Sequence, residues 1–207
     1  MTARETILGD IRRQLGRNSS APPAAPPVRL RIPEVSRARR IESMLERVAA
    51  LAGKAFHARS AQEAIDCVKS VTQGRPWVSS NARFLRELGF ASGITDTAEL
   101  RRACATAGIG ITSADYALAD TGSLVMIASP DDARLISLLP PVHIAVVPAD
   151  RILTGLDELY TLIPRPADRT SSMVFITGPS RTADIEQILV RGVHGPGEIH
   201  VVIVDAL

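Results

Sequence analysis

Residues 172–205 place the strongest limit on the fold, because their pattern predicts a strand, a helix and a second strand in succession. Residues 173–177 (MVFIT) form a short apolar run, and residues 199–204 (IHVVIV) form another. Apolar runs of this length are typical of strands that are buried on both faces of a parallel sheet. Two strands joined by one helix should lie parallel, with a right-handed crossover. The pattern therefore predicts an α/β protein with a mostly parallel sheet flanked by helices.

The residues between these two strands carry apolar side chains at helical spacing. Thr182 is placed to cap a helix, and Asp184 and Glu186 follow in its first turn, where the helix dipole favours negative charge. The glycines and the proline of residues 192–197 would then end the helix. Its apolar stripe would consist of Ile185, Ile188, Leu189 and Val193.

The rest of the chain alternates between predicted strands and helices, as a layered α/β protein requires. Residues 114–119 are expected to begin as a short helix before a turn at residues 120–123. Further strands are expected at residues 54–58, 77–79, 109–112, 124–128 and 142–147. Further helices are expected at residues 36–51, 61–71, 82–88, 98–107, 133–139 and 149–163.

Aromatic residues are scarce, and this limits both the core and the choice of partners. They make up 3% of the chain, against 45% for all hydrophobic residues, so the core must be aliphatic. Nucleic-acid platforms that stack bases need exposed aromatic rings, so we expect no nucleic-acid partner. No apolar run approaches the roughly 20 residues of a membrane helix. The N-terminal residues also lack the hydrophobic region of a signal peptide, so we expect a cytoplasmic protein without a membrane span.

The sequence contains two cysteines, Cys67 and Cys104, which do not form a C-x-x-C pair. Both fall in predicted helices, so buried thiols are the expected state. An iron–sulfur cluster would need four ligands, so we expect no self-supplied cluster. No spacing of histidines and carboxylates indicates a metal site, and the cofactor, if there is one, stays unknown.

The N-terminal part of the chain predicts a tethered helix. Residues 1–17 form an amphipathic helix with Ile7, Leu8, Ile11 and Leu15 on one face, and residues 18–35 contain five prolines. A proline-rich segment of this kind is extended, so it should link the helix to a single α/β domain over residues 36–207. The apolar stripe must dock on that domain or on another subunit.

Charge is divided unevenly along the sequence. Residues 1–59 carry a formal charge of +7, and residues 60–207 carry −5. A basic arm on an acidic domain could bind nucleic acid or an anionic membrane. It could equally dock on its own domain or on a partner protein. The absence of a nucleic-acid motif favours docking on protein.

The loop of residues 177–182 (TGPSRT) is the first place to look for chemistry, because ligands collect at the carboxyl ends of parallel strands. Gly178, Ser180, Arg181 and Thr182 combine the start of the predicted helix with a guanidinium and hydroxyls, which suits a carboxylate or phosphate. The loop lacks the spacing and the lysine of a Walker motif, and the two acidic residues of the helix weaken its attraction for anions. A capped turn without a ligand is the alternative interpretation.

The turn of residues 120–123 is the second candidate. Asp120, Thr121, Gly122 and Ser123 place a carboxylate, two hydroxyls and a glycine within four residues. Glycine lets the backbone approach a ligand closely, and neighbouring amides can form a concave anion site. These residue types are also favoured in ordinary turns, which is the alternative.

Two histidines complete the set of candidates for proton transfer. His143 and His194 both have a side chain that titrates near neutral pH. His143 lies in an apolar strand, where a hydrogen-bonded core histidine is the more common arrangement. His194 lies in a glycine-rich loop. Asp131 and Asp132 follow a proline and predict a solvated turn.

Four segments together resemble a known family. They are ADTGSL (119–124), LLPPVHI (138–144), ITGPSRTADIE (176–186) and GVHGP (192–196). In this order they make residues 36–207 similar to the LUD-domain family. The resemblance implies a NagB/RpiA/CoA-transferase-like fold. It also implies a role in oxidising L-lactate to pyruvate beside two partner subunits, one of them an iron–sulfur protein. The family usually has Glu where this chain has Asp120, which would move a catalytic carboxylate.

The sequence leaves three hypotheses for function. In the first, the chain is a subunit of an L-lactate utilization system with iron–sulfur partner subunits, and it binds a small anionic ligand at the carboxyl edge of the sheet. Arg181 would hold the anion, Thr121 and Ser123 would orient it, and His194 would transfer a proton, with Asp120 and His143 as further catalytic candidates. This hypothesis requires Arg181 and Ser123 to share one cavity.

The second hypothesis is a stand-alone enzyme of the transferase or isomerase type, acting on a phosphorylated or CoA-linked substrate. The third is a non-catalytic interaction subunit, suggested by the tethered helix and the basic arm.

Overall fold

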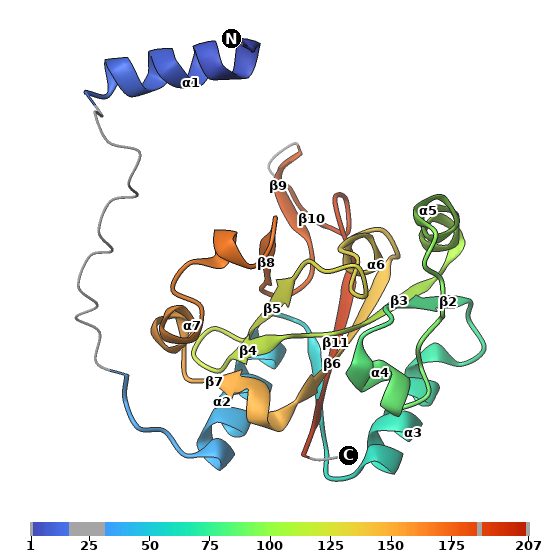
Figure 1. Ribbon diagram of the computed structural model, residues 1–207. Helices are drawn as coiled ribbons and strands as arrows, with labels where there is room; N and C mark the ends of the chain where they lie inside the picture. The colour runs from blue at the N-terminus through green and yellow to red at the C-terminus, as the bar shows by residue number, and fades with distance from the viewer. Residues whose placement is uncertain (1, 17–31, 186–187, 206–207) are drawn as a thin grey trace. The chain divides into compact units, whose positions relative to one another are not determined.

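The structure, a computed structural model, describes residues 2–16, 32–185 and 188–205 of the chain, which divides into two units at residues 31 and 32 (Figure 1). In the first unit, helix α1 (Ala3–Gln14) begins at a capping box in which Thr2 and Glu5 exchange hydrogen bonds. Its apolar stripe is exposed at Ile7, Leu8, Ile11 and Leu15. The helix is therefore present as predicted. The linker expected over residues 18–35 lies mostly outside the described residues.

The second unit is built on a five-stranded parallel sheet with the order β1-β11-β6-β3-β2 (Figure 1). The α/β prediction is therefore confirmed. Residues from β3 and β6 are buried on both faces, and so is β11 after its first residue. The strands are β1 (Lys54–Ala58), β2 (Trp77–Ser79), β3 (Ile109–Ser113), β6 (Val142–Pro148) and β11 (Glu198–Val204).

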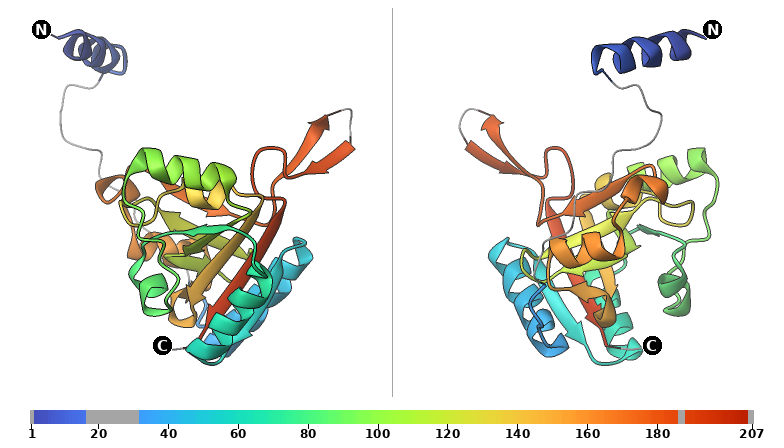
Figure 2. Two further views of the ribbon diagram at one scale, coloured as in Figure 1. Left: turned by 90° about the vertical axis from the view of Figure 1, so that its right-hand side faces the viewer. Right: turned by 60° about the vertical axis from the view of Figure 1, so that its left-hand side comes forward.

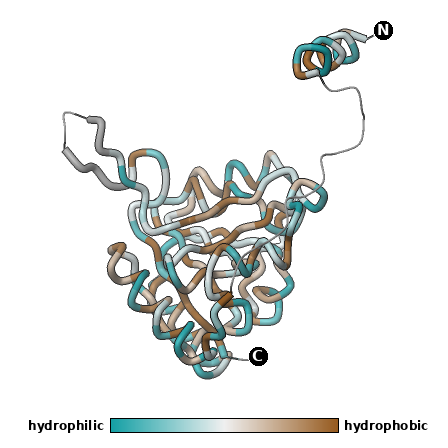
Figure 3. Tube along the Cα trace, turned by 90° about the vertical axis from the view of Figure 1, so that its left-hand side faces the viewer, coloured by the Kyte–Doolittle hydropathy of each residue, from teal (hydrophilic) through white to brown (hydrophobic). Residues whose placement is uncertain are grey.

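Helices cover this sheet on both faces. The residues of β6 alternate between two cores: Ala145 and Val147 pack with α2, whereas Ile144 and Val146 pack with α3 and α4. Hydrophobic residues accordingly follow the interior strands in Figure 3, whereas hydrophilic residues follow the outer surface. The helices are α2 (Arg37–Ala50), α3 (Ala61–Thr72), α4 (Arg83–Glu87), α5 (Thr97–Thr106) and α6 (Leu135–Leu138). None of the described helices is long and apolar enough to cross a membrane. Cys67 and Cys104 are free thiols, and Cys104 is buried.

A second, four-stranded sheet packs on the α2 side, with the order β7-β4-β5-β8. Its strands are β4 (Tyr116–Leu118), β5 (Ser123–Ile127), β7 (Ile152–Leu153) and β8 (Met173–Ile176). The short helix predicted at residues 114–119 is wrong, because Tyr116–Leu118 form β4 and pair antiparallel with β5 instead. The helix predicted at residues 149–163 is also wrong over its first half. A 3₁₀ turn (Ala149–Arg151) and β7 come first, and α7 (Leu156–Leu162) begins only after Gly155.

The helix predicted after Thr182 is wrong as well. Residues 181–185 and 188–191 instead form two antiparallel strands, β9 (Arg181–Ile185) and β10 (Ile188–Arg191), which we call the hairpin and which extend away from the two sheets (Figure 2). A short run of apolar residues satisfies helical and strand spacing alike, and the β-branched residues here favour a strand. β8 also pairs antiparallel with β5 in the second sheet, so β8 and β11 are not the parallel neighbours that the sequence predicted.

Gly110 marks a close approach between α6 and the parallel sheet. A Cβ atom at this position would lie inside 3.0 Å of the Ile136 carbonyl oxygen, a backbone atom that cannot turn aside. We expect Gly110→Ala to lower the free energy of unfolding by about 3 kcal/mol, because the strand and the helix must separate. Chemical denaturation checks this. Gly108→Ala is the matched control, because its Cβ would meet only ordinary contacts at 3.6 Å or more. Equal stability of the two variants would contradict this packing.

Candidate functional site

The five parallel strands end along one edge of the sheet, which we call the carboxyl edge. In open parallel sheets this is the edge at which ligands bind. Two neighbouring cavities of about 370 and 390 Å³ open here. We call them the first and the second edge cavity. Both are lined by Phe84, Glu87, Pro148 and Arg151; Ser113 and Asp115 add to the first, and Arg37, Asp150 and Asp205 to the second.

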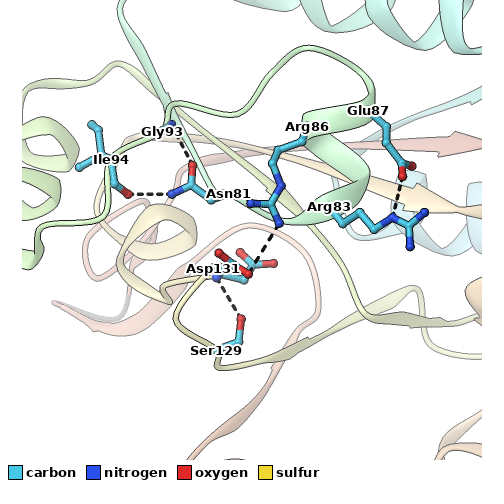
Figure 4. A network of polar contacts seen from close by, with 9 residues as sticks. Asn81, Arg83, Arg86, Glu87, Gly93, Ile94, Ser129 and Asp131 are labelled. Carbon is cyan, nitrogen blue, oxygen red and sulfur yellow. Dashed lines mark hydrogen bonds and ion pairs between the residues drawn. The ribbon is translucent and has the colours of Figure 1, made fainter.

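Most charged groups at these cavities are already paired. Arg37 donates to the Asp205 carbonyl oxygen at 2.7 Å and to its carboxylate at 3.1 Å. His57 lies 3.0 Å from the same carboxylate, and its hydrogen bond lowers the pKa of Asp205. Arg83 pairs with Glu87 at 2.7 Å (Figure 4). In each of these pairs an arginine neutralises a carboxylate, so the paired groups add little net charge to the edge cavities.

Arg151 differs from the other arginines at the carboxyl edge. It lies three residues after the end of β6, in a 3₁₀ turn, and lines both edge cavities. Its guanidinium carbon lies 5.7 Å from the centre of the Tyr116 ring, a cation–π contact that holds the side chain without neutralising it. Arg151 forms no ion pair with any other described residue. Its charge is therefore available to a bound anion.

Ser80, Asp115 and Asp132 form a polar cluster, the Ser80 cluster, beside the first edge cavity. Ser80 directly follows β2, and Asp115 lies just beyond β3. Asp132 comes from the loop after β5. The Asp115 carboxylate accepts a hydrogen bond from the Ile127 backbone amide at 2.7 Å, which fixes the start of that loop. Three segments that are distant in the sequence thus supply the cluster.

Hydrogen bonds from Asn81 hold the loop that carries Asp132 over the end of β2. The Asn81 backbone amide donates to the Asp131 carbonyl oxygen at 2.7 Å. Its side chain donates to the Ile94 carbonyl oxygen and accepts from the Gly93 amide, both at 2.8 Å (Figure 4). Within the loop, the Asp132 amide donates to the Ser129 hydroxyl at 3.0 Å. Hydrogen bonds from the backbone amides of Asn81 and Asp132 therefore fix the position of Asp132.

Burial changes the chemistry of Asp132. It raises the pKa of this carboxyl to about 7, and the negative charge of Asp115 acts in the same direction. The Ser80 hydroxyl faces the carboxyl and offsets part of this effect, but the two groups do not reach hydrogen-bonding geometry. The sequence prediction of a solvated turn is therefore wrong for Asp132, although Asp131 is exposed.

The two predicted anion loops meet, but away from the carboxyl edge. The Ser123 hydroxyl lies 2.8 Å from the Thr121 hydroxyl and 2.7 Å from the Thr177 hydroxyl. Both loops connect strands of the second sheet or the hairpin, so their predicted place at the carboxyl edge is wrong. Neither Ser123 nor Arg181 lines an edge cavity.

Close packing on α2 explains the glycines of these loops. A Cβ on Gly122, whose φ is 71°, would lie 2.8 Å from the Arg47 Cβ atom. A Cβ on Gly178, whose φ is 79°, would lie 3.0 Å from the Leu51 Cβ atom. Arg181 donates to the Leu51 carbonyl oxygen near the end of the same helix. Both loops therefore stabilise the packing of the second sheet on α2.

Ser180 and Thr182 do not form the start of a helix. The Ser180 amide donates to the Pro196 carbonyl oxygen at 2.9 Å, and Thr182 pairs with Val190 in the hairpin. A helix N-terminus, on which the predicted anion site depended, is thus not formed by these residues.

The predicted catalytic residues lie apart from one another. Asp120 points toward Gly155 at the start of α7 and lines a separate cavity of about 250 Å³. His143 is buried near the amino end of β6, and its Nε2 lies 2.8 Å from the Thr112 hydroxyl. Burial lowers the pKa of His143 to about 4, so its ring is neutral at pH 7. His194 is exposed in the loop before β11. Their catalytic roles stay predictions.

Residues 80–204 match the family model described as the LUD domain. The chain belongs to the LUD domain family. This range contains the Ser80 cluster and Arg151. The chain is similar to lactate utilization protein C of Exiguobacterium, with 42% identity over 105 residues, which cover 49% of this chain and 46% of that protein. It is also similar to lactate utilization protein C of Bacillus subtilis, with 40% identity over 94 residues, which cover 44% of this chain and 39% of that protein. The chain thus matches less than half the length of these relatives.

A solved structure of a DUF162 family protein from Deinococcus radiodurans has the same fold. Its TM-score is 0.62 at 20% identity, and the match covers 83% of this chain and 99% of that chain. At this identity the likeness concerns the fold alone.

The residues that the sequence analysis missed share one simple signal. Ser80, Asp115 and Arg151 each follow a parallel strand within three residues of its end. Applying the carboxyl-edge rule to every predicted strand, rather than to residues 173–177 alone, would have selected all three. Asp132 carries no such signal, because it reaches the site from a loop of the second sheet.

Asp132 should make stability depend on pH. An unfolded aspartate titrates near 4, whereas burial raises the pKa of Asp132 to about 7, so the folded chain binds more protons between these values. The free energy of unfolding should therefore fall as pH rises through this window. We expect Asp132→Asn to remove that dependence and to exceed the wild type in stability at pH 8, by at most about 4 kcal/mol.

Chemical denaturation at pH 5 and pH 8 measures this difference. Asp131→Asn, which changes the exposed neighbouring carboxylate, is the control and should follow the wild type closely. A wild type and an Asp132→Asn variant with parallel pH dependence would contradict the assignment.

Proposed function

We propose that the chain is a subunit of an L-lactate utilization system and that it binds a small monoanionic ligand at the carboxyl edge. The names of the similar proteins support the first part. The observation that carries the second part is the guanidinium of Arg151, which lines both edge cavities and pairs with no described carboxylate. A guanidinium binds a carboxylate through two parallel hydrogen bonds.

The surrounding charges favour a monocarboxylate over a polyanion. Glu87 and Asp205 are neutralised by Arg83 and Arg37, which also line these cavities, so the carboxylates that form no ion pair with a described residue there are Asp115 and Asp150. A phosphorylated or CoA-linked ligand would bring several negative charges close to these carboxylates, and each close like-charge pair opposes binding. This balance supports L-lactate or pyruvate as the ligand class, rather than the substrates of a transferase or isomerase.

In this proposal, the conversion of L-lactate to pyruvate releases two electrons and two protons. The electrons pass to iron–sulfur partner subunits. The exposed apolar stripe of α1 supports docking on such a partner, since Ile7 and Leu15 are 59% and 62% exposed.

Arg151 is expected to control affinity for small carboxylates. We expect Arg151→Met to weaken the binding of L-lactate by roughly 10- to 100-fold, the usual loss for one charge-assisted hydrogen-bonded contact. Isothermal titration calorimetry of the full chain measures this. Arg101→Met, on the exposed face of α5, is the control and should bind as the wild type. Arg181→Met tests the alternative loop, and a larger loss there than at Arg151 would contradict the proposed site.

The role in lactate utilization is tested in cells. A strain without this chain should grow poorly on L-lactate and normally on pyruvate. Restoring the full chain should restore growth on L-lactate. In a separate pull-down, a chain with Ile7→Glu and Ile11→Glu should recover fewer iron–sulfur subunits than the wild-type chain, because the apolar stripe of α1 becomes charged. Unchanged growth of the deletion strain on L-lactate would contradict the pathway, and unchanged recovery of partners would contradict the role of α1.

A further inference from the structure

Strand β1 forms one edge of the parallel sheet, and its outer side pairs with no other described strand. Backbone amide and carbonyl groups on that side therefore have no strand partner among the described residues. A free edge of this kind is a template for pairing with another chain, unless it is very short. The opposite edge strand, β2, has only three residues, whereas β1 has five. The edge of β1 is thus the one that a further strand can extend.

Each edge strand also carries one exposed aromatic side chain. Phe56 on β1 is 43% exposed, and Trp77 on β2 is 41% exposed. The Trp77 ring packs edge-on against Phe90, with 6.3 Å between the ring centres. Phe56 forms no aromatic contact with a described residue. An exposed aromatic side chain in the middle of a free edge strand is typical of a protein interface.

A cavity of about 550 Å³, which we call the β1 groove, lies between α2 and this strand. His57 lines it from β1. Its apolar lining from α2 consists of Ala38, Ile41 and Leu45. Ala55 and His57 point to the α2 side of the sheet, whereas Phe56 and Ala58 point to the α3 side. Helices therefore flank both faces of β1, and an added strand would lie between two such layers.

We propose that β1 binds β1 of a second copy of the chain in antiparallel orientation. The two copies then share one continuous sheet with five strands from each. A two-fold axis perpendicular to the sheet passes beside Phe56, which lies opposite Phe56 of the second copy. The same surface is used twice in such an interface, as in most homodimers.

The side chains of β1 are complementary in this register. His57 lies opposite Ala55 of the second copy, and Lys54 lies opposite Ala58, so each long side chain faces a small one. At the axis the two Phe56 rings meet on the α3 side of the sheet. Aromatic pairs directly opposite each other stabilise antiparallel strands.

The charges near β1 support a second copy as the occupant. Glu63 accepts a hydrogen bond from the Arg59 amide at 2.8 Å, so its carboxylate lies at the end of β1. Lys54 lies at the beginning of β1 and is exposed. The two-fold axis brings these two ends together, so Lys54 of each copy lies near Glu63 of the other. Opposite charges that meet twice favour this orientation over a parallel one.

The interface would lie beside the candidate site. Arg37 and Asp205 line both the β1 groove and the second edge cavity. They pair with each other at 3.1 Å, so they add little net charge to the interface.

Analytical ultracentrifugation of the full chain measures the association. We expect the wild type to dimerise and Phe56→Lys to weaken dimerisation at least about 100-fold, because each dimer loses two central aromatic side chains and gains two like charges. Trp77→Lys is the matched control, since Trp77 is the similarly exposed aromatic residue of the opposite edge strand. It should dimerise like the wild type, and circular dichroism should show both variants folded.

A cysteine at the axis tests the register independently. Phe56→Cys should form a disulfide-linked dimer on mild oxidation, because residues directly opposite each other have Cβ atoms only about 4.5–5.5 Å apart. Ala55→Cys should not, because it lies opposite His57 of the second copy. Both variants carry Cys67→Ser, which removes the half-buried native thiol.

Three outcomes would overturn the proposal. The first is a wild type that sediments as a monomer at every concentration, including the case in which Phe56→Lys instead recovers fewer iron–sulfur subunits in a pull-down. The second is a dimer that survives Phe56→Lys but is lost in the chain with Ile7→Glu and Ile11→Glu, because α1 would then join the copies. The third is a disulfide-linked dimer of Ala55→Cys but not of Phe56→Cys.

Discussion

The burial of β6 and β11 between two aliphatic cores is the constraint on which the rest of the structure depends. Side chains alternate along these strands, so each strand must find an apolar partner on both faces at once. On one face α3 and α4 supply that partner. On the other face α2 and the second sheet supply it together. Because the strands are parallel, the same burial brings five strand ends to one edge, where backbone loops rather than side chains of the core meet the solvent.

The same constraint explains why the glycine-rich turns serve packing. The second sheet reaches the core only if its turns pass close to α2, and Gly122 and Gly178 allow that approach with backbone angles that other residues rarely adopt. Hydroxyl groups in these turns then satisfy each other, as Ser123 does with Thr121 and Thr177. Residue types that suit an anion site therefore suit a tight packing junction equally well.

The electrostatics of the carboxyl edge follow from how deeply each carboxyl is buried. Asp205 is solvated and lies beside His57, whose hydrogen bond lowers the pKa of this carboxyl, and Arg37 acts in the same direction. Asp132 is half-buried as a residue, but its carboxyl oxygen Oδ1 is closed to solvent beside another carboxyl, and this desolvation raises its pKa to about 7. Two aspartates at one edge of one sheet thus have opposite properties, and only their surroundings separate them. The guanidinium of Arg151 lies over an aromatic ring rather than against a carboxylate, so this edge offers one cation that forms no ion pair with a described residue.

Much of the fold follows from the sequence alone, because it depends on local patterns. The runs at residues 142–147 and 199–204 are too apolar for solvent, and they and the shorter runs at residues 54–58 and 77–79 are strands of the parallel sheet within one residue of their expected bounds. The caps at Thr2 and Ser36 likewise act within four residues of their own position. The family resemblance followed from local motifs in the same way.

Tertiary structure alone decided the rest, because those features depend on residues that are far apart in the chain. Residues 181–191 fit two periods, and strand pairing selects one of them. Gly122 is needed because of Arg47, and the pKa of Asp132 is raised by its burial first and by the charge of Asp115 second. The distant neighbours of a polar residue, and with them its burial, are not encoded in its own local pattern. The carboxyl edge, and the chemistry available there, therefore emerge only when the chain is folded.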